Sequence, residues 1–322
     1  MSSNAQQARP APPRIDGLNW RPIGERQADQ VAPLAAACVA VDGGLPVATE
    51  VEFLKKRYLS AEEGRSIGAY AREQMVALAS LRLAERESER RALLFGLVHP
   101  VWRGQGIGRF LLDWGEWAAA KVLMRTDDGR ERFLAIATES LTDRADAFYR
   151  RRGYQPEFGE TVMRFDLAHL LPEYELAAGL TVEPWSGANA DDFFAAYEAC
   201  FRERPGFPGW SQQEWQAWAA GEDTFRPERS FVVRGGELPV AFVVCDDAWV
   251  VQMGVAPEWR GCGLGAALLT RVLHLAKAAG DAEVMLDVAF NNPHAAALYA
   301  RVGFTMIGRR ARYMRRMDDS FS

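Results

Sequence analysis

The fold of this chain is decided by one stretch, Val250–Gly280, which reads VVQMGVAPEWRGCGLGAALLTRVLHLAKAAG. It begins as a β-branched apolar run, which is typical of a buried strand, and a proline and three interleaved glycines then break the run. Beyond the glycines, leucine and valine recur at helical spacing up to Gly280, where we expect the helix to end. A strand, a glycine turn and a helix start together aim backbone N–H groups and a helix dipole at one spot, which suits a phosphate group.

Glycine-rich turns occur in several nucleotide-binding folds, so the spacing of the residues within the turn is needed to tell these folds apart. The segment Arg260–Gly265 lacks the lysine and hydroxyl of a P-loop NTPase, and its R-x-x-G-x-G spacing is not the dinucleotide fingerprint. Behind a V-x-P strand end, this spacing resembles motif A of the GCN5-related N-acetyltransferases (the GNAT superfamily). The segment Asn291–Phe304 resembles motif B of the same superfamily, N-x-x-A-x-x-L-Y-x-x-x-G-F, and the two motifs follow in the family's order.

An internal repeat extends the resemblance over nearly the whole chain. The segment Pro100–Gly108, PVWRGQGIG, lines up with Pro257–Gly265, PEWRGCGLG, and even the tryptophan before the arginine repeats. Downstream, Ala147–Tyr154 matches Ala297–Phe304. Two copies predict two domains of one fold. This tandem layout is similar to that of the mycothiol synthase group of the superfamily.

Composition limits the class of protein. The 322 residues allow one large domain or two ordinary ones, and 48% hydrophobic with 25% charged residues is typical of a globular protein. A net charge of −5 predicts no general nucleic-acid binding, and no window approaches the roughly 20 apolar residues of a membrane span. Residues Met1–Arg14 lack an apolar segment, so we expect a flexible tail and no secretion signal. The cysteines lack metal-ligand spacing, which indicates reduced thiols, no metal site and a cytoplasmic protein: Cys38, Cys200, Cys245 and Cys262.

The local patterns predict an α/β fold with two tandem GNAT-like domains, each a mixed, strongly twisted sheet flanked by helices. The expected parts are a disordered tail at 1–14, an N-terminal domain at 15–168, a linker at 169–179 and a C-terminal domain at 180–322. The first copy is expected to hold helices at 29–41, 49–59, 106–124 and 143–152, strands at 19–23, 67–72, 75–83, 93–98, 133–138 and 161–167, a hairpin at 84–89 and a loop at 125–130. The second is expected to hold helices at 191–203, 211–220, the motif helix and 293–302, with strands at 181–183, 231–234, 240–245, 249–255 and 284–288 and paired strands at 305–309 and 313–317.

The resemblance implies transfer of an acyl group, most simply acetyl from acetyl-coenzyme A (acetyl-CoA), to an amine. The cofactor diphosphate needs N–H donors at close approach, which glycines permit, and an arginine beside the turn adds a charge. In the second copy, the expected cofactor-binding residues are Met253, Gly254, Val255, Arg260, Gly261, Cys262, Gly263, Leu264, Gly265, Ala266 and Asn291. In the first copy, they are Leu97, Val98, Arg103, Gly104, Gln105, Gly106, Ile107, Gly108 and Arg109.

Tyr299 matches the family position that serves as general acid toward the leaving thiolate. A phenol of pKa about 10 and a thiol of about 8.5 are close enough for proton transfer. The alternative is a core tyrosine on an amphipathic helix; Tyr149 is the counterpart if the first domain is active. Asn291 matches the motif-B asparagine that contacts the cofactor, and its alternative is a helix cap.

The general base is less evident. Many family members place a glutamate on the strand before the turn, where this chain has Trp249 and, in the first copy, Ala92. Asp247 is the candidate base, with Asp246 beside it, although both also fit an ordinary hairpin turn. A water chain, a weakly basic amine or a carboxylate from elsewhere would serve as well.

An acceptor pocket is expected around Phe207, Trp210 and Trp249, with the loop at 207–210 over an apolar or aromatic acceptor. The alternative is core packing of the following helix through tryptophans three residues apart. The second copy keeps the turn, the asparagine and the tyrosine, whereas the first has Leu141 in place of the asparagine. We therefore expect catalysis in the second copy, with the first binding CoA as a structural ligand or only supporting its twin.

The function predicted from the sequence is N-acylation of a small-molecule amine by a monomer or homodimer. Two alternatives are a non-catalytic acyl-CoA sensor or assembly protein, and an acyltransferase that uses a protein acceptor or a longer acyl donor.

Overall fold

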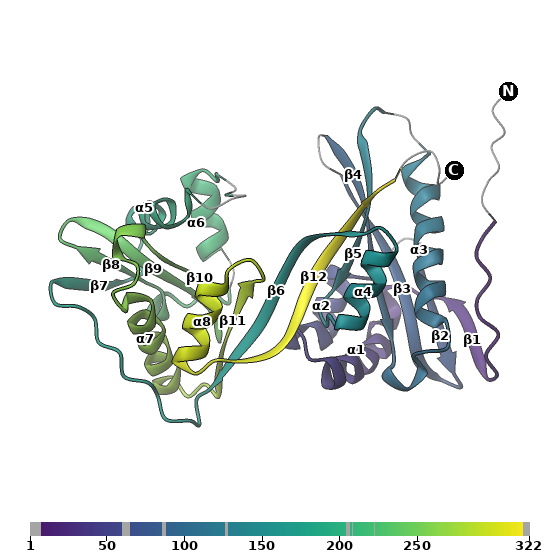
Figure 1. Cartoon of the computed structure of the whole chain (residues 1–322), viewed down its shortest axis with the longest axis horizontal. Helices are drawn as coiled ribbons and strands as arrows, with labels where there is room; N and C mark the ends of the chain where they lie inside the picture. Colours follow the sequence, from purple (N-terminus) through teal and green to yellow (C-terminus); the bar gives the residue numbers. More distant parts are fainter. Residues whose placement is uncertain are drawn as a thin grey trace. The chain divides into compact units, whose positions relative to one another are not determined.

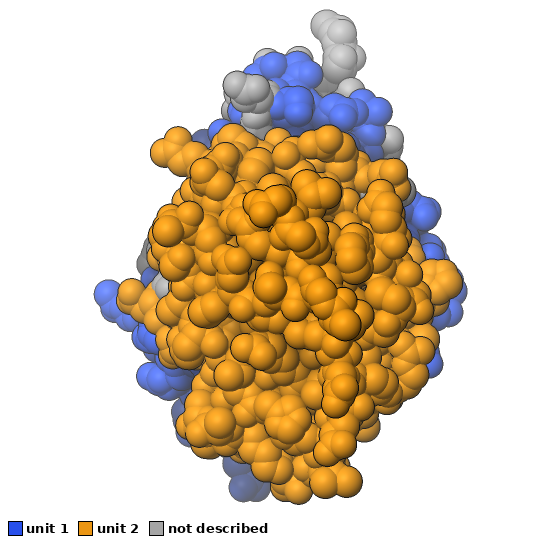
Figure 2. Space-filling model, turned by 90° about the vertical axis from the view of Figure 1, so that its left-hand side faces the viewer, with its two compact units in different colours: residues 1–160, 308–322 blue, residues 161–307 orange. Residues whose placement is uncertain are grey.

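The computed structural model describes residues 8–59, 65–85, 88–125, 128–203, 207, 209–221 and 223–317. It divides the chain into unit 1, residues 1–160 and 308–322, and unit 2, residues 161–307 (Figure 2). Each unit is a mixed sheet flanked by helices (Figure 1), which confirms the predicted fold class. Four predicted segments fall partly outside the described residues: the tail at 1–14, the hairpin at 84–89, and the loops at 125–130 and 207–210.

Unit 1 is organised around one parallel strand pair. Its helices are α1 (Ala28–Asp42), α2 (Val51–Arg57), α3 (Ile107–Leu123) and α4 (Asp143–Arg151). Its strands lie in the order β1 (Leu18–Pro22), β2 (Ser66–Ala71), β3 (Gln74–Glu85), β4 (Glu89–Val98), β5 (Glu131–Thr138) and β12 (Thr305–Arg316). Only β4 and β5 run parallel in this order, and α3 is the crossover helix that joins them.

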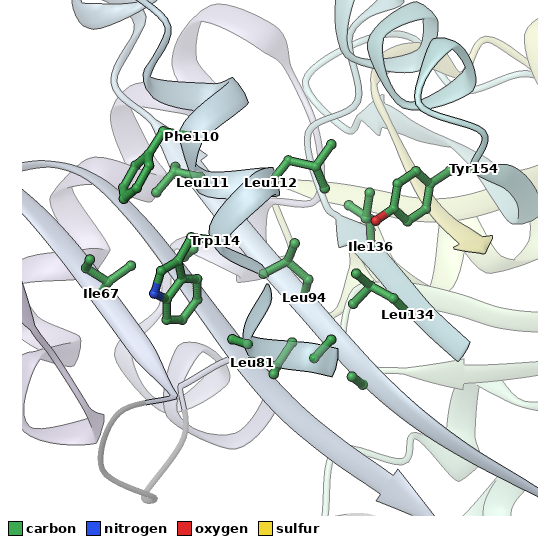
Figure 3. Packing of buried hydrophobic residues seen from close by; sticks show 14 of the residues in the cluster. Ile67, Leu81, Leu94, Phe110, Leu111, Leu112, Trp114, Leu134, Ile136 and Tyr154 are labelled. Carbon is green, nitrogen blue, oxygen red and sulfur yellow. The ribbon is translucent and has the colours of Figure 1, made fainter. Parts of the chain in front are cut away.

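The core of unit 1 fixes α3 against the sheet (Figure 3). Trp114 of α3 is fully buried and packs in one cluster with Leu94 of β4 and Ile136 of β5. A Cβ added at Gly115 would lie 2.4 Å from the Leu94 side chain, so glycine allows the helix to approach the strand closely. This packing holds the N-terminus of α3 at the end of β4.

Unit 2 repeats the plan. Its helices are α5 (Ala190–Phe201), α6 (Gln212–Ala220), α7 (Leu264–Ala278) and α8 (Pro293–Val302). Its strands lie in the order β6 (Gln155–Asp166), β11 (Glu283–Ala289), β10 (Trp249–Val255), β9 (Leu238–Asp246), β8 (Phe231–Gly235) and β7 (Leu180–Pro184). The pair β10 and β11 is parallel, and β7 to β10 are joined antiparallel. One core cluster packs with α7 and α8, and a second, rich in aromatic residues, packs with α5 and α6.

The predicted pair of strands at 305–309 and 313–317 is wrong, because the structure has a single strand, β12, over Thr305–Arg316. The intervening residues, Arg310-Ala311-Arg312, offer no glycine, proline or asparagine to make a turn. Instead, the strand continues with Ala311 and Tyr313 buried, and Arg310 and Arg312 lie on the opposite face of the strand. Residues 311–316 pair antiparallel with β5 inside unit 1.

The compact units differ from the predicted domains at their ends. Residues 161–168 belong to unit 2, and residues 308–322 belong to unit 1. In unit 2, the hydroxyl of Thr305 donates to the carbonyl of Arg164, and the amide of Leu167 donates to the carbonyl of Ala282. Each repeat thus contributes the second part of its last strand, residues 161–166 of β6 or 308–316 of β12, to the unit built mainly by the other repeat. Across the described residues, no helix is both long and apolar enough to cross a membrane.

Candidate acyl-coenzyme A sites

The two glycine turns have the same backbone geometry. Gly104 and Gly106 in unit 1 have φ of 82° and 85°, and Gly261 and Gly263 in unit 2 have φ of 79° and 86°. Gly106 and Gly263 are the left-handed N-cap residues of α3 and α7. A Cβ-bearing residue is strained in this region, which explains the glycine spacing. The first amides of each helix lack intrahelical acceptors and are therefore available to an anion.

The strands beside the turn of unit 2 separate early. The parallel pair β10 and β11 is joined at Trp249 with Met285 and at Val250 with Leu286. β10 then has a bulge in its ladder with β9 between Val250 and Gln252. A bulge bends a strand and increases its twist, so the rest of β10 follows β9. The backbone groups of β10 beyond the bulge therefore lie outside the ladder with β11, where an extended ligand could pair with them.

In unit 1, the parallel ladder is longer. β4 and β5 pair from Glu89 with Glu131 to Phe95 with Ala137, and only the last three residues of β4 extend beyond it. The two repeats therefore share the opening beside the turn, but that of unit 2 starts closer to the beginning of its strand.

Each turn is also held by the arginine that precedes it. The Nε of Arg103 donates to the carbonyl of Val98, and its two terminal nitrogens each lie 2.7 Å from the carboxylate of Asp42. Hydrogen bonding to Asp42 raises the pKa of Arg103. In unit 2, Arg260 donates to the carbonyls of Val255 and Cys200, at 3.0 and 2.9 Å. Both guanidinium groups thus hydrogen-bond to the end of the strand before the turn. This structural role comes in addition to the role beside the cofactor diphosphate that the sequence predicts for these arginines.

A cavity of about 410 Å³ opens beside the turn of unit 1. Its walls include Leu97, Val98, Arg103, Gly104, Gly106, Gly108 and Arg109 from the predicted set, and also Tyr149 of α4. Ile107 is buried in the core, and Gln105 is exposed at the turn. Burial raises the pKa of Tyr149 to about 12.

Three charged residues of the cavity were not predicted from the sequence. Arg144 and Arg151 of α4 line the cavity with Arg109, so three cations besides Arg103 surround it. Asp42, from the end of α1, lines it as well and is paired with Arg103. Arg144 and Arg151 are seven residues apart on the helix that carries Tyr149, so they lie on one face of that helix. This spacing is the sequence signal that could have revealed them.

The predicted cofactor residues of unit 2 differ in their burial. Leu264 and Ala266 are buried in the core, so only their backbone can meet a cofactor, whereas Cys262 is exposed at the turn. Met253 and Val255 are partly buried against the core under α7. A Cβ at Gly254 would lie 2.7 Å from that of Cys200 in α5.

Helix α8 contacts the start of α7, the helix that follows the turn of unit 2. A Cβ added at Gly265 would lie 2.9 Å from the side chain of Leu298 and 3.9 Å from that of Val255. The residue before Tyr299 therefore contacts the first turn of α7, and Tyr299 itself is half-buried against the same core. Asn292 caps α8, with its side chain accepting from the amide of Ala295, while Asn291 is exposed before the cap.

The candidate base and the candidate acceptor-pocket residues lie in three separate places: a hairpin, the start of β10 and the aromatic cluster. Asp247 has a φ of 42°, lies in the hairpin between β9 and β10 and pairs with Arg226, as the hairpin alternative expected. Trp249, the first residue of β10, pairs with Met285. Phe207 and Trp210 pack near Tyr197 in the aromatic cluster, with ring centroids 5.3 and 6.4 Å away.

Each unit thus combines a glycine turn, a parallel strand pair that separates before the turn and a tyrosine on a later helix, an arrangement that fits an acyltransferase. The chain belongs to the GNAT superfamily of acetyltransferases: residues 57–156 match the acetyltransferase (GNAT) domain, and residues 190–304 match the acetyltransferase (GNAT) family. These matches confirm the predicted superfamily and the predicted class of enzyme, an N-acetyltransferase.

Several relatives match this chain over nearly their full length. The mycothiol acetyltransferase of Stackebrandtia nassauensis is 28% identical over 86% of this chain and 91% of its own length. That of Frankia alni is 28% identical over 94% of this chain and 95% of its own. A GCN5-related N-acetyltransferase from Sphaerobacter thermophilus has a TM-score of 0.71 at 24% identity, over 94% of this chain and 96% of that one. A tandem GNAT protein from the clavulanic acid biosynthesis pathway has a TM-score of 0.58 at 19% identity, over 93% and 98%.

Proposed function

We propose that this enzyme transfers the acetyl group of acetyl-CoA to the amine of a small molecule, and that the reaction takes place in unit 2. The observation that carries the proposal is the early separation of β10 from β11 beside the turn at Gly261 and Gly263. A thioester lying along the free edge of β10 would have its diphosphate at the start of α7. Tyr299 would then be placed to protonate the departing thiolate of CoA.

The test of this proposal follows free thiol while the protein is incubated with acetyl-CoA and a panel of amines that includes the acceptor of the mycothiol acetyltransferases. Tyr299→Phe is expected to lower kcat by about 10²-fold or more, since general acid catalysis contributes roughly 10² to 10⁴. Tyr174→Phe, in an exposed segment, is the matched control and is expected to retain the full rate.

Tyr149→Phe decides between the two units. Full activity in Tyr299→Phe together with a large loss in Tyr149→Phe would move the chemistry to unit 1 and contradict the proposal. Absence of thiol release with every amine, despite CoA binding, would favour an acyl-CoA sensor.

We also infer that unit 1 binds CoA. The supporting observation is its cavity, whose size is ordinary for a cofactor site and whose three arginines suit phosphate groups. The double variant Arg144→Ala, Arg151→Ala is expected to weaken one of two CoA binding events by about tenfold or more, as measured by calorimetry. Arg150→Ala is the control, because Arg150 is exposed on the same helix and pairs with Asp146. A single binding event that the double variant leaves unchanged would contradict the inference.

A further inference from the structure

An N-acetyltransferase needs a group that takes a proton from the amine. The opening in unit 2 is flanked by β10 and β11, which carry two carboxylates over Trp249–Val255 and Glu283–Ala289. Glu283 begins β11 and lies 3.5 Å from Arg164. Asp287 is one residue beyond Leu286, where the ladder with β10 ends. Asp287 therefore borders the opening, whereas Glu283 lies before the paired segment.

The side chain of Asp287 emerges on the face opposite to Tyr299. Val284, Leu286 and Val288 of β11 belong to the core cluster that packs with α7 and α8. Because side chains alternate along a strand, Asp287 points to the other face. Gln252 of β10 faces the same way, since its side-chain oxygen accepts from the indole N–H of Trp215 in α6, at 2.9 Å. A thioester between the strands would thus meet Tyr299 from one side and Asp287 from the other.

The fold does not require a carboxylate at this place. When Tyr149 and Tyr299 are aligned, the counterpart of Asp287 in unit 1 is Ala137. Ala137 is 8% exposed and packs in an apolar cluster that includes Phe95. Aspartate is disfavoured in strands, and a half-buried carboxylate loses part of its hydration. An aspartate that replaces a small apolar residue of the twin is therefore expected to have a chemical role.

We propose that Asp287 is the general base of unit 2. The proposal rests on the proposed function and names its proton acceptor. The carboxylate takes one proton from the ammonium form of the substrate and releases it to solvent. The nitrogen lone pair then forms the C–N bond with the thioester carbonyl, and the C–S bond breaks with its electron pair on sulfur. Sulfur takes the proton of Tyr299, and the second proton lost by nitrogen restores the phenol.

The test compares two acceptors that differ in their need for a base. An aliphatic primary amine is protonated at neutral pH, whereas an aromatic amine is already neutral there. Asp287→Asn is expected to lower kcat/KM for the aliphatic amine by about 10² to 10⁴ and to lower that for the aromatic amine less than about tenfold. Glu283→Gln, on the same strand, is the matched control and is expected to leave both rates unchanged.

Two results would overturn the proposal: a wild-type rate of Asp287→Asn with the aliphatic amine, or an equal loss with both acceptors, which a structural role would produce. If Asp287→Asn does not fold, as judged by circular dichroism, Asp287→Ala takes its place in the same assays, because the twin position holds alanine. A wild-type protein that acetylates no amine contradicts the proposed function itself, whereas an active wild type with an unaffected variant contradicts only the role of Asp287.

Discussion

At the scale of the residue, a substitution at Gly263 would test the effect of backbone strain alone, because an added side chain would meet no neighbour. Its φ is 86°, and an added Cβ would meet no atom within 4 Å. Gly263→Ala is therefore expected to destabilise unit 2 through strain alone, by about 1 to 2 kcal/mol, in denaturant unfolding. Gly187→Ala is the control, since Gly187 also has open space around it but is not among the glycines of positive φ; its expected change is within about 0.5 kcal/mol. If the two variants were equally stable, the backbone of the turn would have to adjust to the added Cβ without strain, which would contradict this prediction.

The four free cysteines give a second test at this scale. Cys38, Cys200 and Cys245 are buried, and Cys262 is exposed at the turn of unit 2. Burial raises the pKa of Cys38 to about 11 and that of Cys200 to about 12, so both stay protonated at pH 8 and gain thiolate only as pH rises toward those values. Iodoacetamide at pH 8 is therefore expected to label Cys262 first, as read by peptide mass mapping.

Saturating CoA is expected to slow the labelling of Cys262, because the cofactor would cover the turn. Labelling of the other three cysteines only after unfolding serves as the internal control. Unchanged labelling of Cys262 at saturating CoA would contradict its place in the cofactor site.

The sequence predicted the residues whose role lies in the backbone and missed those whose role depends on distant partners. Glycine spacing reports φ directly, so both turns were found. The pairing of Arg103 with Asp42 could not be predicted, because it joins residues 61 positions apart. The motif asparagine was placed one residue early: counting back from Tyr299 in N-x-x-A-x-x-L-Y leads to Asn292, which the structure shows as the cap.

At the scale of the element, β12 has a consequence for stability that the order of the repeats does not indicate. Ala311 is 4% exposed in the core of unit 1, although it follows the second motif B in the sequence. Ala311→Asp would bury an uncompensated charge there and is expected to destabilise unit 1 by about 3 to 5 kcal/mol. Hydrogen exchange should show lost protection in β5 and α3, with β9 and β10 less affected.

Arg312→Ala is the control for this experiment, because the neighbouring side chain on β12 points outward and is 38% exposed. Protection lost from β9 and β10 in place of β5 and α3 would contradict the assignment of β12 to unit 1.

Elements with a strong local signal were predicted closely. β10 and α8 have the expected bounds, since a β-branched run and a proline-started helix are marked by their own residues. The last strand was predicted as a hairpin because hairpins are the usual way to pair consecutive strand patterns. Its partner β5 lies far away in sequence, and strand patterns do not identify distant partners.

At the scale of the whole molecule, duplication has produced two turns of one geometry with different charges around them. In unit 1, Arg109, Arg144 and Arg151 line the cavity. When the arginines of the two turns are aligned, Ala266 takes the position of Arg109; when the tyrosines are aligned, His294 and Arg301 take those of Arg144 and Arg151. The same cofactor is thus expected to meet more positive charge in unit 1 than in unit 2.

Salt should separate the two binding events, because screening weakens the attraction between phosphate groups and exposed cations. Raising ionic strength from about 0.05 to about 0.5 M is expected to weaken CoA binding to unit 1 more than binding to unit 2, in calorimetric titrations. In the double variant Arg144→Ala, Arg151→Ala, the steeper salt dependence should disappear while the weaker one remains. If both events lose affinity equally with salt in the unaltered protein, the arginines of α4 do not distinguish the two sites, and the backbone amides of the turns provide the common part of the binding.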